Sequence, residues 1–270
     1  MSIIAAASLK GGVGKSHLLF QVSGTLVQLN YKILICDNDP QSSISASFLG
    51  YSTTRTLDPS STIYAVHAGL DPYPEQVVSA TNFPGIDLLP GHRAAAKFNI
   101  PEPHTAPIES QLRVRDFLAE IRDRYDFILI DTAPSLSMAT WAALVAADYF
   151  ITLSQPEDYG SQGAVDVLES AQRVINGPNT DLHLLGLIIS MISPRRSLHQ
   201  LYEKQIRSLY GSKVFAATIP YLSDFSEAVS SRKPISIYKP KSAATRAIRA
   251  VTDELLARIA TSPQEIADHG

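Results

Sequence analysis

A glycine-rich segment near the N-terminus has the residue types that bind phosphate groups. It spans Lys10 to Ser16, reads KGGVGKS, and lies between a short apolar stretch and a longer amphipathic one. Glycines allow a tight turn whose backbone N–H groups point at phosphate oxygens, and the N-terminus of a following helix attracts the same anion. Lys15 can bridge the β- and γ-phosphates, and the Ser16 hydroxyl can bind Mg²⁺. The segment therefore predicts a phosphate loop for a nucleoside triphosphate.

The lysine at position 10 departs from the common pattern of such loops. GxxxxGK[ST] would require glycine where this chain has Leu9, and Lys10 instead precedes a double glycine. This arrangement resembles the deviant Walker A motif of the ParA/MinD family of P-loop ATPases. In that family the additional lysine reaches the partner's nucleotide, so the resemblance implies a homodimer that encloses two ATP and uses Lys10 in trans.

Two further segments place carboxylates directly after apolar runs. The first, Asp37-Asn38-Asp39-Pro40-Gln41, resembles the DxDPQ segment of the same family, and the run FILID, ending at Asp131, resembles its Walker B strand. The resemblance implies that Asp39 orients or activates the attacking water, that Asp37 supports the metal shell, and that Asp131 holds Mg²⁺ through a water. A structural alternative for the first pair is that both aspartates cap a helix beginning near Ser42, which is compatible with catalysis.

The resemblance extends from Ile3 to about Ile259. The segment 148–156 is similar to the strand before the helix of the dimer face, and 217–220 followed by 225–228 is similar to the loop on the adenine side. His17 stands where the family usually has Thr or Ser near the α-phosphate, and Tyr221 and Asp224 stand where relatives often have DNA-binding arginines. The residues that the resemblance assigns to the nucleotide are Lys10, Gly11, Gly12, Val13, Gly14, Lys15, Ser16, His17 and Pro220, with Lys10, Lys15 and Asp39 catalytic and Ser16, Asp37, Asp39 and Asp131 near the metal.

Short apolar runs alternate with longer amphipathic stretches along the chain, and several of the runs are apolar almost throughout. Such runs are typical of strands buried on both faces of a parallel sheet. The pattern predicts a doubly wound, mostly parallel α/β fold with helices on both faces, formed by residues 1–261 and followed by a short polar tail at 262–270. We expect an irregular excursion over the sheet edge at 51–107, which contains eight prolines. The predicted strands are 2–8, 32–37, 85–89, 126–131, 149–154, 184–191 and 214–219, and the predicted helices are 14–29, 107–124, 160–176, 197–210 and 242–260.

Composition excludes several classes of protein. The chain has 270 residues and one cysteine, Cys36, so a disulfide framework and the iron–sulfur branches of the family are excluded. It contains no run of 18 apolar residues, and we expect a cytoplasmic protein. We expect no N-terminal helix-turn-helix domain. The segment 252–260 is interpreted as a helix that packs on the core, so no membrane partner is expected.

The formal net charge of −3 conceals an uneven distribution. Residues 190–251 contain eleven basic and three acidic side chains, a net charge of +8. A segregated basic surface matters more than net charge for binding phosphates, so we expect non-specific DNA binding by the ATP-bound dimer. Some of these side chains could instead simply solvate helix faces. The candidate DNA contacts are Arg195, Arg196, Lys239, Lys241, Arg246 and Arg249.

Together these features predict a nucleoid-associated ATPase that positions a plasmid, a chromosome or a protein organelle. A ParB-like or other small activating protein would stimulate its slow hydrolysis. The alternatives are a MinD-like regulator at a membrane surface and an ATP-gated adaptor that binds protein without DNA.

Overall fold

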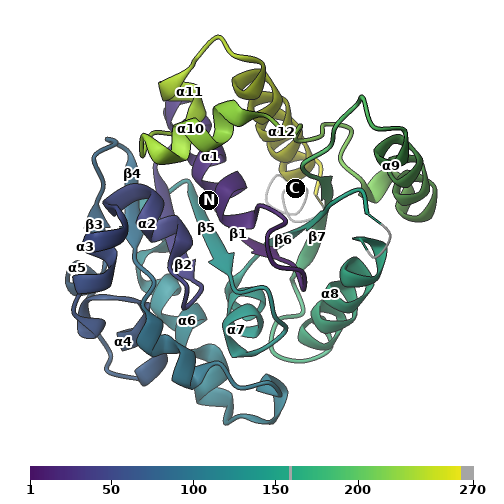
Figure 1. Cartoon of the computed structure of the whole chain (residues 1–270). Coiled ribbons are helices and arrows are strands. Elements are labelled where there is room, and N and C mark those ends of the chain that lie inside the picture. Colours follow the sequence, from purple (N-terminus) through teal and green to yellow (C-terminus); the bar gives the residue numbers. More distant parts are fainter. Residues whose placement is uncertain (158–159, 263–270) are drawn as a thin grey trace.

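A seven-stranded sheet forms the centre of the computed structural model, which describes residues 1–157 and 160–262 (Figure 1). In the described residues the strand order is β3-β4-β2-β5-β1-β6-β7, and every neighbouring pair is parallel except β3 with β4. The predicted doubly wound, mostly parallel fold is confirmed. The strands are β1 (Ser2–Ala7), β2 (Ile33–Asn38), β3 (Ser79–Ala80), β4 (Ile86–Leu89), β5 (Phe127–Thr132), β6 (Tyr149–Ser154) and β7 (His183–Ile189).

The four central strands are buried at every position, as their continuous apolar runs predict. Alternation along β2 divides its side chains between two cores: Ile33 and Ile35 pack in one, Leu34 and Cys36 in the other. Asp37 therefore belongs to the first face and Asn38 to the second. This division determines which helices each of the two polar side chains meets.

The first face is covered by α1 (Lys15–Gln28), α2 (Ser43–Leu49), α10 (Ser223–Ser230), α11 (Ile235–Tyr238) and α12 (Ala243–Ala260). The second is covered by α4 (Ile63–Ala68), α6 (Ile108–Ile121), α7 (Met138–Ala146) and α8 (Gly160–Ile175). Figure 1 shows α1, α11 and α12 above the sheet and α4, α6 and α7 below it. A smaller core joins β7 to α9 (Ser197–Tyr210). The five predicted helices are confirmed within three residues at each end.

The segment 51–107 does lie at a sheet edge, formed by β3 and the predicted strand β4, but the expectation that it is irregular is wrong. This range contains α3 (Tyr51–Thr56), α4, α5 (Pro74–Val77), the edge strands β3 and β4, and 3₁₀ turns at Pro59–Ser61, Arg93–Phe98 and Pro103–Thr105. Three of the eight prolines begin elements here: Pro59, Pro74 and Pro103 each stand in the first turn, where the missing N–H costs nothing. Further 3₁₀ turns lie at Arg122–Arg124 and Gly211–Lys213.

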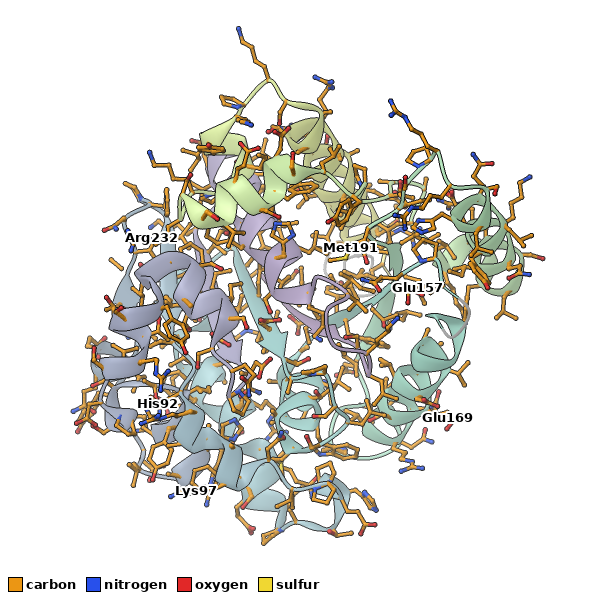
Figure 2. All side chains as sticks on the ribbon, in the orientation of Figure 1. His92, Lys97, Glu157, Glu169, Met191 and Arg232 are labelled. Atoms are coloured by element: carbon orange, nitrogen blue, oxygen red, sulfur yellow. The ribbon has the colours of Figure 1, made fainter. Side chains whose placement is uncertain are left out.

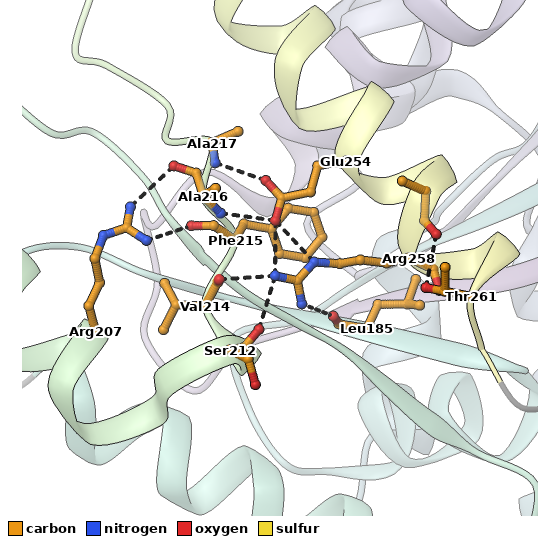
Figure 3. Close-up of polar contacts among 11 residues, drawn as sticks. Leu185, Arg207, Ser212, Val214, Phe215, Ala216, Ala217, Glu254, Arg258 and Thr261 are labelled. Carbon is orange, nitrogen blue, oxygen red and sulfur yellow. Dashed lines mark hydrogen bonds and ion pairs between the residues drawn. The ribbon is translucent and has the colours of Figure 1, made fainter.

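The predicted strand at 214–219 is also wrong. It makes only isolated bridges, between Leu187 and Val214 and between Ile192 and Pro220. Side chains satisfy much of its backbone (Figure 3): Arg207 donates to the carbonyl oxygens of Phe215 and Ala216, and Glu254 accepts the N–H groups of Ala216 and Ala217. These bonds take the place of a continuous sheet ladder, so an apolar run that reads as a strand stays irregular.

The apolar face of α12 packs on the first core through Ala244, Ile248, Val251 and Leu255, which confirms a core-packing role for this helix. Within the described part of the chain, the helices lack the combination of length and apolar character that crossing a bilayer requires. Residues 263–270, which make up nearly all of the predicted polar tail, lie outside the described residues, so the tail stays a prediction.

Candidate active site

The predicted phosphate loop connects the carboxyl end of β1 to the first turn of α1. Gly12 and Gly14 have φ angles of 77° and 93°, which L side chains rarely adopt, and Gly14 is the N-cap of the helix. The N-terminal N–H groups of α1 therefore face the loop, where an anion is favoured. A cavity of about 330 Å³ opens over the loop, and residues 11–17, Asp39, Gln41, Ser43, Thr132 and Pro134 line it.

The ammonium group of Lys15 is buried at the base of this loop. Its Nζ donates a hydrogen bond to Ser8 Oγ at 2.7 Å, and the residue is only 6% exposed. Burial lowers the pKa of Lys15, while the negative charges of Asp131 and Asp39 act in the opposite direction. Lys15 is thus a desolvated cation with two carboxylates near it, able to interact strongly with an incoming phosphate.

Asp37 and Asp39 have different partners although they lie two residues apart. Asp37 Oδ2 accepts hydrogen bonds from Ser45 N at 2.9 Å and Ser45 Oγ at 2.5 Å, so the capping alternative describes Asp37, whose contacts are in α2. Burial raises its pKa. Asp39 lines the cavity, and its Oδ1 accepts the N–H of Gln41 at 2.8 Å. Burial raises the pKa of Asp39 too, and the Lys15 charge opposes that shift.

The carboxylate of Asp131 is fully buried and has no hydrogen-bond partner of ordinary geometry among the described residues. It lies beside Asp37, its register partner on the neighbouring strand. Its pKa is raised by burial and then by the charge of Asp37, while the Ser16 hydroxyl and the Lys15 charge lower it. A buried carboxylate without a partner is costly, and a cation with its waters would relieve that cost.

These residues fit Mg²⁺ bound together with a nucleotide. In the described part of the chain no three His, Cys, Asp or Glu side chains converge as a cage for a metal ion. Mg²⁺ needs no such cage in nucleotide sites, because it keeps several waters and takes phosphate oxygens with one or two protein ligands. Ser16 and Asp131 supply oxygen atoms of this kind beside the loop.

A second, smaller cavity of about 90 Å³ lies beyond Gly14 on the side of α10. His17 and Pro220 line it, as does Met191, which the sequence did not single out. The His17 ring packs edge-on against Phe225, with 5.1 Å between centroids, and its Nε2 lies 3.0 Å from Gln21 Nε2. Burial lowers the pKa of His17, so the neutral ring is favoured despite a hydrogen bond to the Phe225 backbone.

Lys10 does not line the cavity over the loop, and its side chain is paired with Glu157 of the same chain. Both side chains are about half exposed, at 44% and 53%. Figure 2 labels Glu157 and Met191, which line a common cavity next to the loop. Gln155 adds a contact there, since its Nε2 donates to Gly12 O at 3.1 Å and to Met191 Sδ at 2.9 Å. Met191 has a φ of 54°, a conformation that sequence periodicity cannot reveal.

The six candidate DNA contacts fall into two groups. Lys239 Nζ donates to Asp224 at 2.6 Å and Glu227 at 2.7 Å, bonds that raise its pKa, and Arg249 pairs with Asp253 at 2.8 Å. Within residues 1–157 and 160–262, the other four are exposed and have no ion pair: Arg195, Arg196, Lys241 and Arg246. Two of the six candidates are thus neutralised by carboxylates of the same chain, and the other four are available to bind a polyanion.

A glycine loop that opens a helix at the carboxyl end of a parallel sheet, with a buried Walker B aspartate on the adjoining strand, defines a P-loop nucleoside triphosphatase. A family model described as an AAA domain matches residues 1–184. The chromosome partitioning protein ParA of Caulobacter vibrioides is 31% identical, with 96% of this chain and 95% of that protein covered. The chromosome-partitioning ATPase Soj of Thermus thermophilus is 33% identical, with 95% and 96% covered. The chain belongs to the ParA family of partitioning ATPases.

The fold agrees with this assignment. A solved ATP complex of a Cyanothece McdA variant is 19% identical, covers 97% of each chain and gives a TM-score of 0.81, which shows the shared fold. Family membership together with the phosphate loop makes this chain an ATPase.

Proposed function

We propose that this ATPase positions or segregates a cargo by cycling on and off DNA. Two copies enclose two ATP, the dimer binds DNA without sequence preference, and a small activating protein stimulates hydrolysis and so releases it. Relatives named as chromosome partitioning proteins support the cargo role. The observation that carries the DNA step is the set of four exposed cations without an ion pair, described above.

In the proposed reaction, water attacks the γ-phosphorus and the bond to the β–γ bridging oxygen breaks. Asp39 orients that water, since it is the carboxylate that lines the cavity above the loop. Lys15 and the loop N–H groups stabilise the charge that develops on the phosphate oxygens. Mg²⁺, when bound, neutralises the β- and γ-phosphates, with Ser16 and Asp131 on its side of the site and Asp37 supporting that region from β2.

The role of Asp39 is tested by Asp39→Ala. We expect hydrolysis to fall at least about 100-fold while nucleotide binding persists, because positioning of water is lost and the loop is intact. Single-turnover hydrolysis and binding of a fluorescent ATP analogue measure the two effects. An unchanged hydrolysis rate would remove Asp39 from the reaction.

The dimer is tested at Lys10. Its side chain points to Glu157 of its own chain, and an exposed pair of this kind is worth only about 0–1 kcal/mol, so it can be exchanged for a phosphate of the partner. We expect Lys10→Ala to abolish ATP-dependent dimerisation in sedimentation velocity. Lys32→Ala, at an exposed lysine that precedes β2 at the amino end of the strands, should leave it intact. A normal dimer in Lys10→Ala would contradict the trans role.

The DNA step is tested with random-sequence duplex and ATP. We expect the parental protein to shift DNA with ATP and not with ADP, and the fourfold charge reversal of Arg195, Arg196, Lys241 and Arg246 to lose the shift. Lys32→Glu is the matched control for a charge reversal elsewhere. ATP-dependent dimerisation without a DNA shift would favour the protein adaptor instead.

A further inference from the structure

Asn38 stands between the two aspartates of the strand end, and its side chain lies on the other face of the sheet. Its Nδ2 donates to the carbonyl oxygen of Ala139 in the first turn of α7, at 2.7 Å. Its Oδ1 lies 2.6 Å from Nε2 of His67, the penultimate residue of α4. One amide thus joins the end of β2 to two helices of the second layer.

The geometry determines which way these hydrogen bonds run. The Asn38 amide nitrogen donates to a carbonyl, so its oxygen is the acceptor, and His67 must carry its proton on Nε2. His67 is buried, and this burial lowers its pKa to about 4, so the ring is neutral at physiological pH. Arg113 of α6 donates to the His67 carbonyl oxygen, which fixes the end of α4 from a third helix.

The hydrogen bond between Asn38 and Ala139 joins two segments that each contribute a residue to the lining of the nucleotide cavity. Asp39 follows Asn38 directly, and Pro134 in the loop before α7 lines the same cavity beside Gly11. Asn99 holds the start of α7 separately, since its Oδ1 accepts from Ser137 Oγ and Ala139 N. The Asn38 bond to Ala139 ties this anchored helix start to the strand end that carries Asp37 and Asp39.

We propose that His67 is a positioning residue for ATP hydrolysis. It acts through Asn38 to hold Asp39 at a fixed position relative to the loop that precedes α7. This inference rests on the proposed role of Asp39. The surrounding core is apolar, so packing alone does not require a polar pair here. The cost of burying these two polar side chains is offset only if all of their hydrogen bonds are formed. Without the His67 proton, Asn38 Oδ1 loses its buried donor and the amide is free to rotate. A displacement of about 1 Å at a catalytic group can cost about 100-fold in rate.

The experiment compares His67→Leu with His67→Gln. Glutamine can donate from its amide to Asn38 and leucine cannot. We expect His67→Leu to lower kcat at least about 10-fold with KM within about twofold of the parent, and His67→Gln to recover kcat to within about threefold. Leu118→Ala, a buried substitution in the same core with no contact to Asn38, is the control for destabilisation alone and should leave kcat unchanged below its melting temperature.

Several outcomes would overturn the inference: parental kcat in His67→Leu, failure of glutamine to restore the rate, or an equal loss in Leu118→Ala. Should His67→Leu not fold, the apolar pair Asn38→Leu/His67→Leu replaces it, and the same kcat comparison decides. Asp39→Asn is measured in parallel. If Asp39→Asn hydrolyses ATP at the parental rate, the proposed function of Asp39 fails; if it is inactive while His67→Leu is normal, only the positioning role fails.

Discussion

At the scale of single residues, the site is defined by ionisable groups that burial pushes toward their neutral forms. Lys15 is shifted to a lower pKa, and Asp37, Asp39 and Asp131 to higher ones. Asp131 and Asp39 lie near the ammonium group of Lys15, and Asp37 lies beside Asp131, so acidic groups outnumber the cation in a poorly solvated region. A divalent cation relieves this excess, and the charge of the triphosphate then meets Lys15 and the helix N-terminus.

Asp131→Asn should stabilise the nucleotide-free protein while it removes the response to Mg–ATP. The raised pKa means that the folded state disfavours the charged form, so at neutral pH folding must either bury the ionised carboxylate or take up a proton, and both cost stability. We expect a gain of about 1–3 kcal/mol in the free energy of unfolding. Saturating Mg–ATP, which should stabilise the parent by about 3 kcal/mol at 100 times Kd, should add little to the variant.

Chemical denaturation with and without Mg–ATP measures both effects. Asp123→Asn, at an exposed carboxylate, is the matched control and should change the free energy of unfolding by less than about 0.5 kcal/mol. A variant that is less stable than the parent without nucleotide would show that Asp131 has a favourable partner in the free protein.

His67 makes a separate contribution to the pH dependence of stability. Its pKa falls from 6.5 to about 4 on folding, so the unfolded chain binds the proton more readily. Its stabilising effect is complete above pH 6.5 and is lost as the pH falls toward 4, a change of about 3 kcal/mol. The free energy of unfolding of the parent minus that of His67→Gln, measured from pH 7.5 to 4.5, should decline through this window. A flat difference would mean that folding leaves the pKa of His67 unchanged.

At the scale of elements, sequence periodicity predicted the strands and helices that depend on local sequence pattern. It failed where contacts with distant residues determine the conformation of a segment. Buried strands and long amphipathic helices were predicted because their periods are intrinsic to the sequence. The segment 214–219 has the composition of a strand, but Arg258, Arg207 and Glu254 satisfy its backbone from distant elements. Gly186 allows this close approach, since a Cβ there would lie 2.4 Å from Lys213 O.

The candidate site shows the same division. Lys15 was predicted from the glycine-rich loop, and the roles of Asp39 and Asp131 came from the resemblance of their segments to the ParA/MinD family. The link from Asn38 to His67 was not predicted, because the two residues are 29 positions apart, Asn38 is the unspecified position of the DxDPQ segment, and His67 belongs to no motif. The pairing of Lys10 with Glu157 escaped prediction for the same reason, at a separation of 147.

The segment held by Arg258 gives a prediction for α12. Arg258 donates to the carbonyl oxygens of Leu185, Ser212 and Val214, lies over the Phe215 ring and pairs with Glu254 (Figure 3). Arg258→Met keeps much of the aliphatic packing and leaves these acceptors without a donor. We expect a loss of about 2–4 kcal/mol in the free energy of unfolding.

Arg249→Met is the control on the same helix. Arg249 also forms an i,i+4 pair, with Asp253, but both side chains are about half exposed, so we expect a loss below about 0.5 kcal/mol. Urea denaturation of both variants measures the two losses in the free energy of unfolding. Equal losses would mean that the Arg258 bonds contribute no more than a surface pair.

At the scale of the whole molecule, charge is segregated in a way that the net value hides. The range 190–251 carries +8 of formal charge in a chain whose total is −3. Ion pairs reduce this excess: Arg207, Lys239 and Arg249 are bound to carboxylates. The exposed cations before α9 and at the start of α12 are among those that remain for a polyanion, and the proposed dimer would present two sets of them.

This distinction between paired and unpaired cations predicts the salt dependence of DNA binding. Each phosphate contact contributes about 0.9 to the slope of log K against log salt concentration, because neutralised phosphates release counterions. Replacing Arg195, Arg196, Lys241 and Arg246 by Gln removes up to four contacts per protomer, so the slope should become several units shallower. Lys239→Gln/Arg249→Gln removes cations whose charge is already matched within the chain, and should change the slope by less than about 1. Fluorescence anisotropy with random-sequence duplex and ATP, from 50 to 300 mM salt, measures both slopes. If the paired set changes the slope more than the unpaired set, these ion pairs open on DNA and the binding face is centred on α10 and α11.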